Sequence, residues 1–327
     1  MKERKTTRFE QETQCNWGVT NDDHGLPLPQ NLGYVALSYA WGDPTSTTRI
    51  EVNGVQVSVT SSLEAALRAL RGKSFIRQGG AVWADALCID QSNLSERSKE
   101  VRRMREIYRN ADSVVVWIGP ESDDSAKAIS LMKTMAMAFR HVTDLELAAR
   151  IRSGSSTILP GSWLALDAFM KRQYWNRLWI LQEIAVGNRS TPLLCGNHSI
   201  TWGEFYDALY HFSSRYIEIA FSCISWECKE AGIASNGIRR NHIIQLNRQQ
   251  EILAGLKPTN CLPILDVARQ CDVSDPKDRI YGILGMMPPD ISDRIVPYYR
   301  NRVGEIYLSF ARAVISSRKS QGRSTKM

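Results

Sequence analysis

The sequence predicts an α/β fold with a mostly parallel sheet and flanking helices. Three short apolar segments, residues 34–40, 81–89 and 113–119, are bounded by turn residues and have the length of strands. Residues 96–111 repeat apolar side chains at helical spacing, and 113–119 is apolar at almost every position, which is typical of a parallel strand covered on both faces. Strand, helix and strand in this order indicate right-handed crossovers.

The first part of the chain also contains a hairpin and a capped helix. After the turn at 41–44, residues 50–57 alternate around an Asn-Gly pair, which is the strongest short hairpin signal. Ser61 and Glu64 have the spacing of a capping box, so we expect a helix that begins at Ser61 and stops at Gly72.

The rest of the chain is mostly helical. We expect helices at 124–142, 162–171, 174–186, 238–253, 262–271, 279–286 and 303–317, a short strand at 192–195, and a helix opened by the capping box of Thr201 and Glu204. The chain is therefore predicted to divide into an N-terminal lead-in (1–32), an α/β domain (33–197), a helical extension (198–317) and a basic, disordered tail (318–327).

Composition narrows the class of protein. The net charge of +7 comes mostly from residues 1–10 and 318–327, so no basic face for specific nucleic-acid binding is predicted. No apolar segment is long enough to span a membrane, and the first residues lack the apolar run of a secretory signal, so we expect a cytoplasmic protein. The seven cysteines have neither disulfide-framework nor zinc-site spacing, and we expect reduced thiols and no metal site.

The segment 174–186 carries a carboxylate in an apolar setting. As one helix it would place Trp179 and Glu183 on a common face with Trp175. A buried carboxylate needs either a cation such as Arg177 or a cleft reached by ligand and water. The simpler alternative is that Glu183 lies on a solvated edge of a core helix.

The carboxyl ends of the predicted strands suggest a second group of site residues. Parallel sheets bind ligands beyond these ends. The group consists of Ser38, Tyr39, Trp41, Gly42, Asp85, Asp90 and Gln91. Asp85 and Asp90 could equally be structural caps or ion-pair partners. Sequence motifs of serine hydrolases, dinucleotide-binding folds and zinc proteases are absent, which leaves carboxylate chemistry in an aromatic-lined cleft.

Three motifs, together with a later segment, resemble those of one known family. They are Tyr34-Val35-Ala36-Leu37-Ser38-Tyr39-Ala40-Trp41-Gly42, then Trp83-Ala84-Asp85-Ala86-Leu87-Cys88-Ile89-Asp90-Gln91, then Tyr174-Trp175-Asn176-Arg177-Leu178-Trp179-Ile180-Leu181-Gln182-Glu183. In this order they resemble the fungal heterokaryon-incompatibility (HET) domain over about residues 34–196. Residues 275–285 are similar to a segment that often follows this domain.

This resemblance implies more than the residues alone. HET domains are distantly similar to TIR domains, which have a flavodoxin-like core and many of which hydrolyse NAD with a helical glutamate. The segment 179–184 resembles that helix, which implies Glu183 as the catalytic carboxylate and NAD as a substrate, with no bound cofactor. Trp41, Tyr39 or Trp179 would stack on a ring of the ligand, and Gly42 would approach its phosphate. Arg177 would either bind pyrophosphate or keep Glu183 ionised.

Two further hypotheses stay open. The first is a non-enzymatic module for fungal cell-death signalling, which acts as a homo-oligomer or by binding an incompatibility partner protein. The second is a sensor that binds NAD or a related nucleotide without cleaving it.

Overall fold

The structure of the chain is a computed structural model that describes residues 33–141, 161–212 and 262–324, with side chains for 33–137, 161–209 and 264–317. The predicted lead-in (1–32) and the predicted helix at 238–253 lie outside the described residues.

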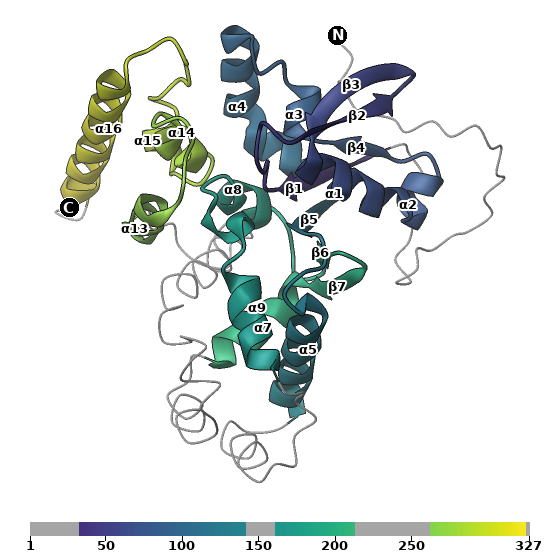
Figure 1. Ribbon diagram of the computed structural model, residues 1–327. Coiled ribbons are helices and arrows are strands. Elements are labelled where there is room, and N and C mark those ends of the chain that lie inside the picture. The colour runs from purple at the N-terminus through teal and green to yellow at the C-terminus, as the bar shows by residue number, and fades with distance from the viewer. Residues whose placement is uncertain (1–32, 142–160, 213–261, 325–327) are drawn as a thin grey trace.

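The fold is α/β and is built on a mixed, mostly parallel sheet (Figure 1). Strand β1 (Tyr34–Tyr39) lies between β4 (Ala81–Trp83) and β5 (Ser113–Gly119), and both neighbours run parallel to it. Beyond β5 lie β6 (Pro192–Cys195), which is parallel, and β7 (His198–Thr201), which is antiparallel. When only the five strands of this sheet are numbered along the chain, their order across the sheet is 2-1-3-4-5. This is the strand order of flavodoxin-like sheets.

The two faces of β1 carry different layers. Val35, Leu37 and Tyr39 pack against α1 (Ser61–Arg71), which lies with α2 (Ser74–Arg77) beside the sheet. Tyr34 and Ala36 on the other face pack against α4 (Leu94–Arg109). Because side chains alternate along a strand, Ser38 points to the α4 side of the sheet.

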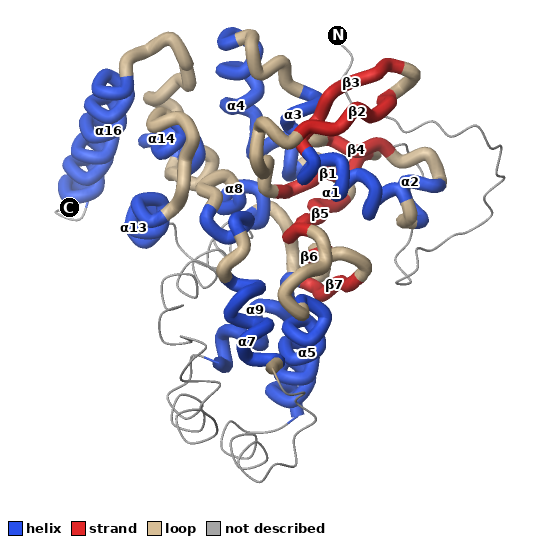
Figure 2. The backbone as a smooth tube through the Cα atoms, in the orientation of Figure 1, coloured by secondary structure: helices blue, strands red, loops and turns tan. Residues whose placement is uncertain are grey.

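The predicted hairpin is present as β2 (Thr47–Val52) and β3 (Val55–Thr60), a separate two-stranded sheet that is visible in red in Figure 2. Asn53 and Gly54 have φ of 51° and 75°, and a two-residue hairpin turn requires such positive values at both positions. Helix α1 begins at Ser61 as predicted, but the capping residue differs. Thr60, and not Ser61, is the N-cap, and its Oγ1 accepts the Leu63 N–H at 3.3 Å.

The prediction of one strand at 81–89 is wrong. The strand ends at Trp83, and helix α3 (Asp85–Cys88) follows at once. The Asp85 side chain accepts the Ala86 N–H at 2.8 Å, and such local bonding favours a helix start over a strand. Asp90 and Gln91 therefore follow α3 and not a strand end.

The prediction of one helix at 174–186 is also wrong. A 3₁₀ turn, η1 (Gln173–Asn176), and the short helix α8 (Ile180–Ala185) are separated by an extended Arg177 with φ −69° and ψ 135°. Asp272 causes this break, since its N–H donates to Asn176 O at 2.7 Å and its carbonyl accepts from Leu178 N at 3.3 Å. Trp175 consequently does not share a helical face with Glu183.

A second helical group packs at the end of the sheet that carries β6 and β7. It contains α5 (Ser125–His141), α7 (Ser162–Met170) and α9 (Trp202–Phe212), and α5 contacts both of the others (Figure 1). The capping box predicted at the start of α9 is confirmed, because Thr201 Oγ1 accepts the Glu204 N–H at 3.2 Å while Glu204 accepts the Thr201 N–H at 2.9 Å. Strand β7 was not predicted.

The C-terminal part consists of α13 (Leu262–Gln270), α14 (Asp278–Leu284), α15 (Pro289–Ser292) and α16 (Val303–Ser324). Helix α14 lies directly on α8. A Cβ on Gly282 would lie 2.9 Å from Leu178 Cδ2, so this glycine permits the close approach. No described helix has both the length and the apolar character needed to cross a membrane.

Trp175 tests the packing of the second helical group. Its ring stacks on Phe205 with centroids 4.8 Å apart, and only 2% of its surface is exposed. Trp175→Ala should lower the free energy of unfolding by about 3–5 kcal/mol, since it removes a large buried ring and leaves a cavity.

Urea unfolding of the purified chain measures this change. Val55→Ala, at a side chain that is 60% exposed, is the control and should stay within about 0.5 kcal/mol of wild type. A loss for Trp175→Ala no larger than the control's would contradict this packing.

Candidate functional site

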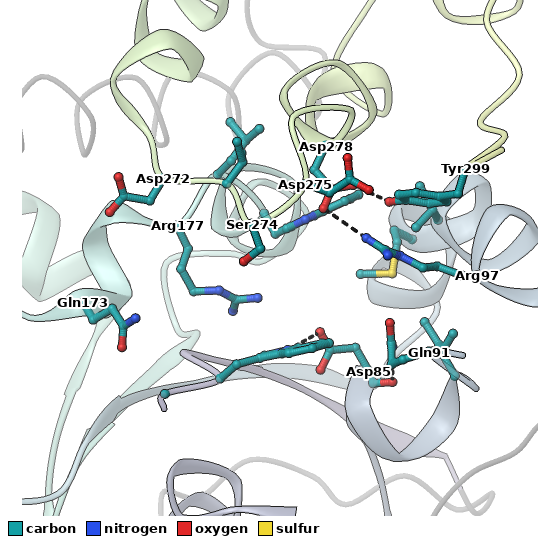
Figure 3. Close-up of a pocket in the computed structure, with 18 residues that line it drawn as sticks. Asp85, Gln91, Arg97, Gln173, Arg177, Asp272, Ser274, Asp275, Asp278 and Tyr299 are labelled. Atoms are coloured by element: carbon teal, nitrogen blue, oxygen red, sulfur yellow. Dashed lines mark hydrogen bonds and ion pairs between the residues drawn. The ribbon is translucent and has the colours of Figure 1, made fainter. Parts of the chain in front are cut away.

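A cavity of about 490 Å³ opens beyond the carboxyl ends of β1 and β4. Three parts of the chain form it: the segment after β1, the α3–α4 region, and a wall made by residues 173–179 and 272–278 with Tyr299. In Figure 3, Asp85 and Gln91 lie on one side of the cavity, and Asp272, Ser274 and Asp275 lie on the other. The volume is in the range of small-molecule sites.

Trp41 is an aromatic wall of the cavity that a carboxylate holds in place. Its indole Nε1 donates to Asp85 Oδ2 at 2.8 Å, although the side chain is 39% exposed. Asp85 itself is buried, and its backbone carbonyl accepts from Gln91 Nε2 at 3.2 Å. The next residue, Gly42, has φ of 75°, and a Cβ there would lie 3.0 Å from Ser62 Cβ. The indole is thus fixed before any ligand arrives.

Arg177 points into the cavity (Figure 3). Its guanidinium donates a hydrogen bond to the Tyr39 carbonyl. Burial lowers the pKa of Arg177, but the nearby carboxylates of Glu183 and Asp85 raise it, and the net pKa lies above its ordinary value. Because a guanidinium has five N–H donors, most of its donors remain available to a ligand.

Glu183 lies behind the cavity and does not line it. The side chain is 1% exposed, and Ser38 Oγ donates to its Oε2 at 2.5 Å. The Ser38 hydroxyl also forms a 2.7 Å hydrogen bond with the Tyr174 hydroxyl. Strand β1, η1 and α8 therefore meet at one buried polar cluster of Ser38, Tyr174 and Glu183.

The protonation of Glu183 reflects its burial. Removal from water raises the pKa of Glu183 from its ordinary value of 4.5 to about 7, and the effects of Arg177 and the Ser38 hydrogen bond only partly offset this. The carboxyl is thus poised to gain or lose a proton near neutral pH.

Of the other predicted site residues, some line the cavity and some lie outside it. The Tyr39 ring packs beside α1, and burial together with the nearby Asp85 carboxylate raises the pKa of its hydroxyl, while its carbonyl accepts from Arg177. Asp90 accepts the Ser92 N–H at 3.0 Å and lies in a turn outside the cavity. Trp179 and Gln91 line the cavity as expected.

The sequence analysis did not predict that residues 272–278 and Tyr299 line the cavity; we call them the second wall. Asp278 forms an ion pair with Arg97 at 3.4 Å and accepts a hydrogen bond from the Tyr299 hydroxyl, and the Arg97 guanidinium lies 3.8 Å from the centre of the Tyr299 ring. Burial raises the pKa of Asp278, although Tyr299 and Arg97 oppose this. The one signal for this wall was the similarity of residues 275–285 to a segment that follows HET domains.

The described residues contain no group of three or more histidine, cysteine, aspartate or glutamate side chains placed to hold a metal ion. The side chains that line the cavity include the guanidinium of Arg177, the indoles of Trp41 and Trp179, and the carboxylate of Asp85.

These features define the class: an α/β protein with a polar, indole-lined cavity at the carboxyl edge of a mostly parallel sheet. Residues 34–183 match the family model described as heterokaryon incompatibility protein (HET). The chain is 40% identical over 123 residues to heterokaryon incompatibility protein 6, OR allele, of Neurospora crassa. The match covers 35% of this chain and 18% of that relative. No solved structure matches the chain.

The raised pKa of Glu183 makes stability depend on pH. Between pH 4.5 and about 7 the folded protein keeps a proton that the unfolded chain has released, so this group's contribution to the free energy of unfolding falls as the pH rises. Glu183→Gln keeps an acceptor for Ser38 but cannot ionise. Relative to wild type, its free energy of unfolding should therefore rise by up to about 3 kcal/mol across this window.

Urea titrations of both proteins at several pH values measure the difference. Glu106→Gln, at a side chain that is 72% exposed, is the matched control, and its difference from wild type should stay nearly constant. A constant difference for Glu183→Gln as well would mean that Arg177 keeps the carboxylate ionised throughout.

Proposed function

We propose that this chain acts in heterokaryon-incompatibility signalling and that its cavity binds NAD or a related nucleotide. The observation that carries the proposal is the Arg177 guanidinium, which is directed into a cavity walled by Trp41 and Trp179. A phosphate would accept hydrogen bonds from the remaining N–H groups of Arg177, and an indole would stack on the planar ring of the ligand. The relative named above supports the signalling role through its own name.

The position of the cavity supports the same ligand class. It lies beyond the carboxyl ends of β1 and β4, and open α/β sheets bind their ligands outside the carboxyl ends of their strands. The fixed indole of Trp41 lowers the entropy that a ligand loses on stacking.

We also propose that the bound NAD is hydrolysed, in line with the similarity of residues 179–184 to the catalytic helix of TIR domains. The bond from the ribose carbon to the nicotinamide nitrogen breaks with its electrons moving to nitrogen, and water forms the new bond to carbon and releases a proton. Glu183 would stabilise the positive ribose as this charge develops. Its pKa of about 7 suits a group that exchanges protons near neutral pH.

This reaction requires a rearrangement. Glu183 is buried against Ser38, so Arg177 must leave the Tyr39 carbonyl for a ribose to reach the carboxylate. A ligand phosphate that draws Arg177 away from the Tyr39 carbonyl would supply that movement.

A second candidate is a non-enzymatic signalling module. The burial of Glu183 and its short hydrogen bond to Ser38 favour it, because this is also how a structural carboxylate would be held. In that case the cluster of Ser38, Tyr174 and Glu183 would fix the sheet to α8, and the chain would act through a partner protein.

The binding proposal predicts that Arg177→Gln weakens the affinity for NAD about ten- to a hundredfold, since a hydrogen-bonded charge contact is lost. Isothermal titration calorimetry measures the affinity. Arg68→Gln, at a side chain that is 76% exposed on α1, is the control and should bind as wild type does. Equal affinity in all three proteins would show that Arg177 does not contribute to NAD binding.

The hydrolysis proposal predicts that wild type consumes NAD and releases nicotinamide, whereas Glu183→Gln binds NAD but turns it over at least about a hundredfold more slowly. Chromatography of the products at low and high protein concentration measures this. Binding without turnover in wild type would identify a sensor. Neither binding nor turnover, with both proteins folded, would favour the signalling module.

A further inference from the structure

Helix α16 has an unpaired apolar stripe on its outer face. Its inner side chains, Ile306, Phe310 and Ala313, are buried, and the helix lies at the edge of the molecule in contact with α14 and α15 (Figure 1). On the opposite face Leu308 and Ile315 are 51% and 55% exposed. Both large side chains thus face water on a helix whose opposite face is buried against the protein.

The stripe has a regular spacing. Gly304, Leu308, Ala311 and Ile315 follow one another at intervals of four, three and four residues, and all four are exposed. This is the spacing at which two helices pack along a common seam. A Cβ placed on Gly304 meets no atom within 4 Å, so the space above this residue is open. We call these four residues the α16 stripe.

We propose that the α16 stripe pairs with the same stripe of a second copy of this chain, with the two helices antiparallel. In this register Leu308 lies opposite the partner's Ala311, and Ile315 lies opposite the partner's Gly304. A large side chain then meets a small one at every level. A parallel pair would place Leu308 against Leu308 and glycine against glycine, and it would pack less evenly.

The charges beside the stripe favour the same orientation. Glu305 and Arg312 occupy the same side of the seam, one heptad apart, and both are exposed. An antiparallel pair brings Glu305 close to the partner's Arg312, and the twofold symmetry repeats this contact. Arg312 has no ion pair among the described residues. Glu305 uses one carboxylate oxygen to accept the Arg302 N–H at 3.0 Å, which leaves the other for the partner.

The pairing explains why α16 keeps large apolar residues in water. Because one helix pair buries less surface than the roughly 1,200 Å² of a small stable interface, the dimer should be weak and should depend on protein concentration. The inference does not depend on NAD binding or hydrolysis, and either can fail without affecting it.

Sedimentation velocity of the full chain over a range of concentrations tests the proposal. Wild type should shift from monomer towards dimer as the concentration rises. Leu308→Glu and Ile315→Glu should each raise the dissociation constant at least about a hundredfold, because each buries a charge in the seam. Val55→Glu, at an equally exposed apolar residue on the hairpin, should dimerise as wild type does. Circular dichroism confirms that each variant is folded.

Charge exchange tests the orientation. Arg312→Glu and Glu305→Arg should each dimerise poorly, since like charges meet at both flanks. An equimolar mixture of these two variants should dimerise about as well as wild type, because every carboxylate then faces a guanidinium. A wild-type monomer at all concentrations, a dimer that survives Leu308→Glu, or a mixture no better than its components would overturn the proposal.

Discussion

The backbone bridge between Asp272 and residues 176–178 sets the geometry of the site. It takes the hydrogen bonds that a continuous helix would have used and leaves Arg177 extended. The chain then enters α8 in a new direction, which places Glu183 against Ser38 and sends the Arg177 guanidinium into the cavity. The same bridge fixes residues 272–278 as the second wall. One tertiary contact therefore positions the cation, the buried carboxylate and the cavity wall together.

The charged groups of the site alternate in sign from the buried interior towards the cavity. A buried carboxylate, Glu183, lies behind a guanidinium, Arg177, which in turn faces a cavity that also contains Asp85. Burial and the opposing effect of Arg177 together leave the pKa of Glu183 at about 7. Movement of Arg177 would change the charge of Glu183, because the two groups interact in a region that water does not reach. A ligand that moved Arg177 would therefore couple its own binding to proton binding at Glu183.

The cavity does not lie within the family-matched segment alone. The family match ends at residue 183, yet Asp278 and Tyr299 close the far side by holding Arg97 on α4. Gly282 allows α14 to approach Leu178 closely, so the C-terminal part rests on the same segment that carries Glu183. The C-terminal helices thus complete the site, and the outer face of α16 remains open beyond them.

The sequence by itself determined the elements whose signals are local. The apolar runs of β1 and β5, the Asn-Gly hairpin, the capping box of α9 and the amphipathic α4 each depend on neighbours along the chain. It also indicated that Glu183, Arg177, Trp41 and Asp85 belong to one region.

Only the tertiary structure decided how these residues meet. The periodicity of residues 174–186 fits one helix, but hydrogen bonds to Asp272, nearly a hundred residues later, outweigh that local preference. The Asp85 carboxylate accepts from Trp41 Nε1, a contact between distant segments that no pattern within 81–89 encodes. Contacts between distant segments carry no periodic signal, so the burial of Glu183 and the second wall could not be predicted from the chain alone.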